Sequence, residues 1–138
     1  MDDAEEIQLL LRVILKLCKR ELEDTRQFVS CGAGLGSNRN IELLRPSRTT
    51  ATEVRKYREY WERQLRDLAS RQACRVLAWW MNSMVITDAS SESTVFIHIE
   101  HAEGKTSEIY VPYSGVSSAE VTYGKTFEGH APERYLFT

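Results

Sequence analysis

A histidine, a glutamate and a second histidine lie close together in the chain, as His98, Glu100 and His101. On a strand, alternation puts His98 and Glu100 on one face and His101 on the other. Two side chains on one face can share a proton, but a metal site needs three or four converging ligands. The spacing therefore predicts a polar pair between strands and no metal or other cofactor.

Three cysteines, Cys18, Cys31 and Cys74, are the candidate nucleophiles, and the chain has no GxSxG motif. Cys18 falls on the apolar stripe of a predicted helix and Cys74 at the start of a predicted strand, as is typical of core thiols. Cys31 stands next to Gly32, and we interpret it too as a packed, inert thiol. An odd number of cysteines without CxxC spacing favours a reducing compartment, so we expect a cytoplasmic protein.

The glycine-rich stretch at 32–37, Gly-Ala-Gly-Leu-Gly-Ser, has no lysine of the P-loop type, and no predicted helix follows it. Glycines in a strand mark a bulge or a close approach of the backbone to a neighbour. This stretch therefore predicts an irregular strand rather than a phosphate site.

Charge is distributed unevenly along the chain, whose net charge is 18 − 20 = −2. Residues 45–75 hold nine Lys/Arg against four Asp/Glu, whereas residues 76–138 hold three against eight. The second half also carries most of the tyrosines, but a nucleic-acid surface needs aromatic rings on a basic face. This pattern argues against nucleic acid. It has two interpretations, ordinary solvated faces or an acidic docking surface for a basic protein partner, and the second gives the functional hypothesis.

The pair Trp79 and Trp80 must point to opposite faces of a strand, so we expect one ring in the core. The other ring lies either under a helix or on an exposed face, where it would be an interface anchor, since the two helices could cover one face of the sheet or one face each. Together with the acidic half, this gives the predicted partner-binding residues: Trp79, Trp80, Glu100, Glu108, Tyr110 and Glu120.

Two helices and a series of strands must position these residues. Helical spacing of apolar residues predicts a helix over 3–25 and another over 51–71, the second opened by a capping box, Thr50 to Glu53. Period-two patterns predict strands over 28–35, 41–44, 73–86, 94–101, 107–113 and 121–127, with a short last one at 135–137. The apolar residues of 73–86 on both faces predict a central strand covered from both sides.

The chain of 138 residues, with 42% hydrophobic and 28% charged residues, has the composition of one globular domain. The element order α-β-β-α-β-β-β-β predicts a single α+β domain over 1–138 with a mixed or antiparallel sheet. The acidic N-terminus is unlike a secretory signal, and the apolar run at 7–17 is too short and too charged to span a bilayer. We therefore expect no membrane partner.

Several short motifs resemble a family of small uncharacterised bacterial proteins. They are Glu21-Leu22, Phe28 before Gly32-Ala33, the segment from Ile99 to Gly104, Val111-Pro112-Tyr113, and Val121 to Gly124 with Phe127. Ser30-Cys31 departs from the Pro-Phe of that pattern, and Asn38-Arg39 departs from its Asp-Gly turn. The resemblance implies a bacterial, cytosolic, single-domain protein and carries no activity.

These observations favour a non-catalytic domain that binds another protein, such as an immunity or antitoxin-like protein that masks a toxin or effector. A small-molecule-binding or minor enzyme domain is the alternative, with a pocket between sheet and helices lined by Asn82, His98, Glu100, Tyr110 or Tyr123. A homodimer through the sheet face or edge is compatible with both. The sequence leaves the partner, the strand order and the oligomeric state open.

Overall fold

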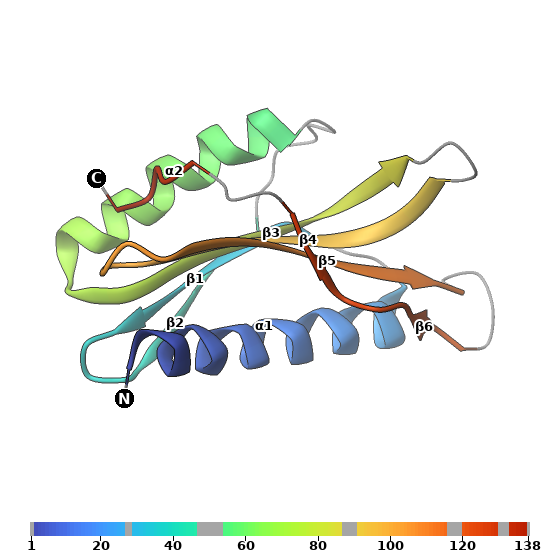
Figure 1. Ribbon diagram of the computed structural model, residues 1–138, viewed down its shortest axis with the longest axis horizontal. Helices are drawn as coiled ribbons and strands as arrows, with labels where there is room; N and C mark the ends of the chain where they lie inside the picture. The colour runs from blue at the N-terminus through green and yellow to red at the C-terminus, as the bar shows by residue number, and fades with distance from the viewer. Residues whose placement is uncertain are drawn as a thin grey trace.

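The computed structural model describes residues 2–26, 29–46, 54–86, 91–115, 120–129 and 133–137. These residues form one twisted antiparallel sheet with a helix on each face (Figure 1). The α+β class and the predicted order of elements are confirmed. The predicted capping box from Thr50 to Glu53 lies outside the described residues.

Helix α1, Asp3–Thr25, begins where the side chain of Asp2 accepts a hydrogen bond from the Glu5 N–H, 2.8 Å away. It ends at Arg26, whose backbone is left-handed. Three acidic residues in the first turn favour the positive end of the helix dipole. Helix α2, Val54–Arg71, lies on the opposite face of the sheet (Figure 1). No described helix is long and apolar enough to cross a membrane.

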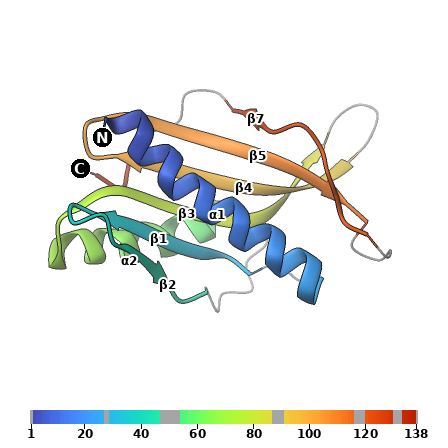
Figure 2. The same ribbon diagram turned by 90° about the horizontal axis from the view of Figure 1, so that it is seen from below.

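The sheet has the order β2-β1-β3-β4-β5-β6, and the short β7 also pairs with β5. Its strands are β1 (Cys31–Gly36), β2 (Ile41–Leu44), β3 (Cys74–Ile86), β4 (Ser91–His101), β5 (Thr106–Ser114), β6 (Thr122–Tyr123) and β7 (Phe127–Glu128). Figure 2 shows β2 at one edge of the sheet and β7 beside the other. The expected central strand is β3, which pairs with β4 over most of its length and with β1 over its first half, Cys74 to Trp80.

Four of the strand predictions are wrong. The strand expected over 28–35 begins at Cys31 and continues to Gly36. The strand expected over 94–101 begins earlier, because β4 already pairs with β3 from Ser91. The strand expected over 121–127 is two strands of two residues each, and both pair with β5. Residues 135–137 form no strand, because their backbone N–H groups bond to the side chain of Glu100 instead of to a neighbouring strand.

The core has two layers, one on each face of the sheet. Alternate residues of β3 divide between them: Trp80 packs in the layer with α1, and Trp79 packs in the layer with α2. Helix α2 can approach β1 closely because glycines face it. A Cβ atom on Gly32 would lie 2.7 Å from Cε3 of Trp61. The close approach predicted for this glycine stretch is thereby confirmed.

Candidate functional site

The two adjacent tryptophans are both buried, one on each face of the sheet. Trp79 donates its indole N–H to the hydroxyl of Tyr135, 2.8 Å away, and lies edge-on to Phe96. Trp80 packs in the layer of α1. Neither ring is an exposed interface anchor as the sequence predicted, because each face of β3 is covered by its own helix.

Glu100 is also fully buried, so the prediction that it belongs to an acidic surface is wrong. Its Oε2 atom lies 2.7 Å from Nε2 of His98, and the other ring nitrogen of His98 lies 2.8 Å from Oε2 of Glu108 on β5. The shared face of His98 and Glu100, and the opposite face of His101, are as predicted. His101 instead contacts Glu6 of α1, at 3.0 Å.

The segment 133–137 covers Glu100 from the side of α2. The backbone N–H groups of Tyr135, Leu136 and Phe137 donate to the Glu100 carboxylate at 3.0–3.1 Å. These charge-assisted hydrogen bonds compensate the buried negative charge of the carboxylate. The ring of Tyr135 also stacks on His98, with ring centres 4.4 Å apart.

Both ring nitrogens of His98 face carboxylate oxygens, which calls for an N–H on each nitrogen. Burial opposes the charged imidazolium, but the hydrogen bonds that it donates to Glu100 and Glu108 outweigh burial and raise the pKa of His98. Burial likewise opposes ionisation of Glu100, and the His98 and backbone hydrogen bonds outweigh it and lower its pKa. The geometry therefore holds a proton on His98 between two carboxylates.

This network resembles an acid–base pair in composition, but the carboxylate of Glu100 and the ring of His98 are closed to solvent. General acid–base catalysis needs hydrogen-bond reach to a substrate atom, and here segment 133–137 occupies that position. In the described part of the chain no three His, Cys, Asp or Glu side chains converge as metal ligands.

The five residues expected to line a small-molecule pocket do not converge. Tyr123 packs toward α1, and its hydroxyl reaches Glu23. Asn82 accepts a hydrogen bond from Tyr113, which packs in the same layer. His98, Glu100 and Tyr110 lie on the opposite face, so the sheet itself separates the two groups.

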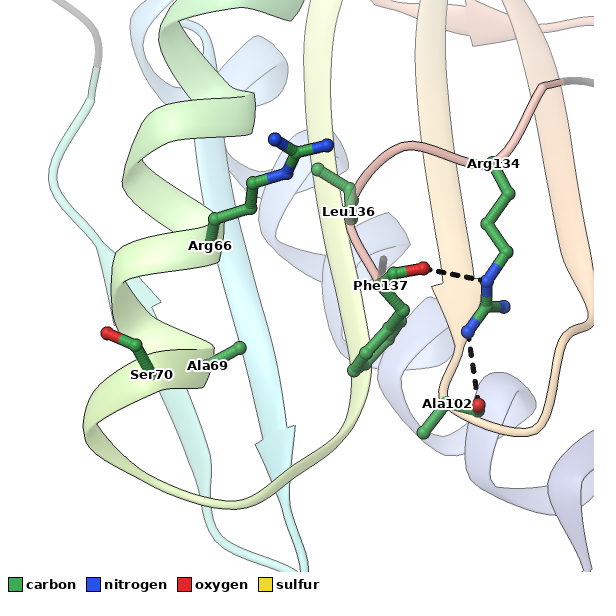
Figure 3. Close-up of a pocket in the computed structure, with 7 residues that line it drawn as sticks. All are labelled: Arg66, Ala69, Ser70, Ala102, Arg134, Leu136 and Phe137. Carbon is green, nitrogen blue, oxygen red and sulfur yellow. Dashed lines mark hydrogen bonds between the residues drawn. The ribbon is translucent and has the colours of Figure 1, made fainter.

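A cavity of about 530 Å³ opens beside segment 133–137, between it and α2 (Figure 3). Two arginines border it, but protein groups already bind both. The Arg66 guanidinium donates to the Tyr135 carbonyl and pairs with Glu62. Arg134 donates to the carbonyls of His101, Ala102 and Phe137, two of which Figure 3 draws. Through these bonds the two arginines hold segment 133–137 in place, and the bonds occupy guanidinium donors that a bound anion would need.

Two of the predicted residues that reach the surface, Glu108 and Tyr110, lie on β5 near the outer edge of the sheet, where β7 pairs with it. Glu108 keeps about a quarter of its side chain exposed. Tyr110 is half-buried and stacks on Phe127, with ring centres 5.1 Å apart and planes within 9°. Phe127 is 41% exposed, one of three large hydrophobic residues so exposed in the described part. The exposed Glu128 follows it on β7.

We call Glu108, Tyr110 and Phe127, which share one face of the sheet, the β5–β7 edge surface. Sequence reasoning placed Glu108 and Tyr110 in the docking surface but missed Phe127, whose exposure depends on the two-residue strand β7. Glu120 is exposed but precedes β6, which pairs at the far end of β5, away from this surface.

Comparisons of the chain with protein-family models, curated proteins and solved structures gave no match. The resemblance to small bacterial proteins therefore stays a prediction.

Proposed function

We propose that the chain is a non-catalytic domain that binds another protein through the β5–β7 edge surface. The observation that carries the proposal is the exposed ring of Phe127, stacked on Tyr110, with the partly exposed Glu108 on the same face of the sheet. Aromatic side chains dominate the energetics of protein interfaces because they bury a large area at a small entropic cost. The stack holds the Phe127 ring in one orientation before a partner arrives.

The partner presents arginine or lysine to this surface. A guanidinium can lie over an aromatic face and reach a neighbouring carboxylate at the same time. Glu108, on the same face of the sheet as Tyr110 and Phe127, supplies a partly exposed carboxylate. Such a contact weakens as salt screens the charges. A bacterial toxin or effector with a basic active face is the partner class we favour, which would make the chain an immunity-like protein of the cytoplasm.

The partner can be captured directly at the surface. We would replace Phe127 with a photo-crosslinking phenylalanine analogue in the cells that make the protein, irradiate them, and identify adducts by mass spectrometry. The matched control carries the same analogue at Arg12, an exposed position on α1 on the other side of the sheet. The proposal predicts one discrete adduct from position 127 that is absent from position 12.

Two results would reject the proposal. One is a chain that crosslinks to nothing at position 127 although the variant is folded. The other is the same set of adducts from both positions, which marks random collision. If the captured protein is a toxin, adding the purified wild-type chain should suppress its activity, and a Phe127→Ala chain should suppress it less.

A further inference from the structure

The two edges of the sheet differ. The edge at β5 is covered, because β6 and β7 both pair with it. At the opposite edge, no described strand pairs with the outer side of β2 (Figure 2). An open edge presents N–H and C=O groups that another strand can pair with. This edge is therefore the place where the described sheet can be extended.

The direction of those groups follows from the hairpin. The Gly36 N–H donates to the Asn40 carbonyl at 2.8 Å, so residues 40, 42 and 44 turn their backbone groups toward β1. By alternation, Ile41 and Leu43 turn theirs outward. Leu43 is the most exposed large hydrophobic residue of the described chain, at 52%.

An apolar groove of about 500 Å³ opens next to this edge, between β2 and the second half of α1. We call it the β2 groove. Its apolar lining comes from Leu17, Cys31, Leu43, Leu44, Pro46 and Trp80. A partner that paired with β2 would also cover this groove, so backbone pairing and apolar burial would act together.

The charges around the β2 groove indicate what that partner is. Two are positive, Arg20 and Arg45, and two are negative, Glu21 and Asp24. A strongly acidic or strongly basic partner would meet repulsion from one of the two pairs. In a two-fold dimer the same patch of both copies meets. A second copy of this chain would therefore bring its acidic residues toward the arginines of the first copy, and its arginines toward the acidic residues of the first copy.

We propose that the chain forms a two-fold dimer in which β2 of one copy pairs antiparallel with β2 of the other. A two-fold axis through such a pair places one residue opposite itself. Leu43 is the central one of the three outward-turned residues 41, 43 and 45, so it faces Leu43 of the second copy. Ile41 then faces Arg45, whose aliphatic stem covers it. The result is a continuous sheet across both copies.

The first test is sedimentation equilibrium over a wide range of protein concentration. The wild-type chain should approach twice its 15.9 kDa mass as concentration rises. Leu43→Asp should stay monomeric and, at dilutions where the wild-type chain is also monomeric, should have the same melting temperature, because the side chain is exposed. Phe127→Asp, at the opposite edge and similarly exposed, should still dimerise. A dimer that persists in Leu43→Asp would overturn the proposal, and so would a wild-type chain that is always monomeric.

The second test fixes the register. Residues opposite each other in a hydrogen-bonded antiparallel pair have Cα atoms about 5.5 Å apart, within disulfide range. Leu43→Cys, in a Cys31→Ser background, should form a covalent dimer on mild oxidation, whereas Glu42→Cys should not. Equal crosslinking from both positions would overturn the register. Binding of decanoate in the groove of a monomeric wild-type chain would show a small-molecule site instead.

Discussion

Glu100 and His98 lie two residues apart on β4, and their side chains meet at 2.7 Å in a position that solvent does not reach. The carboxylate is held by the histidine of its own strand and by three backbone N–H groups of segment 133–137. The Glu100 side chain thus joins the sheet to segment 133–137.

Glu100→Gln should destabilise the fold strongly. The amide cannot accept from all these donors as an ionised carboxylate does, and it leaves His98 with only the partly exposed Glu108 as a counter-charge. Breaking one side of a buried charged pair costs about 3–5 kcal/mol. Urea unfolding measures this cost, with the exposed Glu128→Gln as the control, which should change stability by less than about 0.5 kcal/mol. Equal effects of the two variants would show that Glu100 is not an anchor.

Acid should destabilise the protein through two depressed carboxylates. The hydrogen bond from Arg75 lowers the pKa of Glu6, and the hydrogen bonds from His98 and the backbone lower that of Glu100 against the opposing effect of burial. Their contribution is complete above the ordinary value of 4.5 and is lost as the pH falls through the folded pKa. Unfolding free energy measured against pH should therefore decline below about pH 4.5. Glu6→Gln and Glu100→Gln should each flatten that decline.

A rise in pH should destabilise the protein through His98, whereas the two carboxylates destabilise it when the pH falls. Because its pKa is raised in the folded protein, its contribution is complete below the ordinary value of 6.5 and is lost as the pH rises through the folded pKa. The free energy of unfolding should therefore also decline as the pH rises above about 6.5. His98→Gln should be less stable and should lack this alkaline slope. A wild-type curve that is level from pH 6.5 to 9 would contradict a protonated His98.

Tyr135→Phe tests the contact between segment 133–137 and the core. The change removes the hydroxyl that accepts the Trp79 indole N–H and leaves that donor buried without a partner. Such a loss costs about 1–3 kcal/mol. Thermal unfolding should show the drop, whereas the half-buried Tyr60→Phe should change little.

Part of this arrangement was predictable from the sequence, because it depends on local periodicity. Strand alternation placed His98 and Glu100 on one face, and the two-sided apolar pattern of 73–86 identified the central strand. The glycine at 32 signalled a close approach, although not that Trp61 would be the neighbour. In each case the information lies within one or two elements.

The burial of Glu100 was not predictable in this way. Its donors are backbone N–H groups 35 to 37 residues away, and backbone groups carry no sequence signature. The burial of both tryptophans was not predictable for a related reason. The sequence left open whether the two helices cover one face of the sheet or one face each. The exposure of Phe127 follows from a strand too short to produce a periodic pattern.

Gly32→Ala tests the packing of α2 on β1. The added methyl group would overlap the Trp61 ring, and overpacking of this kind costs about 1–3 kcal/mol. The cost should shrink in a Trp61→Leu background, where the overlapping ring atoms are gone. A double-mutant cycle in urea measures the difference. An additive cycle would show that Trp61 does not set the cost.

The proposed function is tested most directly by the affinity of the partner captured at position 127. Calorimetric titration with the purified partner should give at least about a tenfold weaker binding for Phe127→Ala than for the wild-type chain, as expected for an interface anchor. Binding should also weaken as salt is added. Equal affinities for the two chains would contradict a docking surface centred on Phe127.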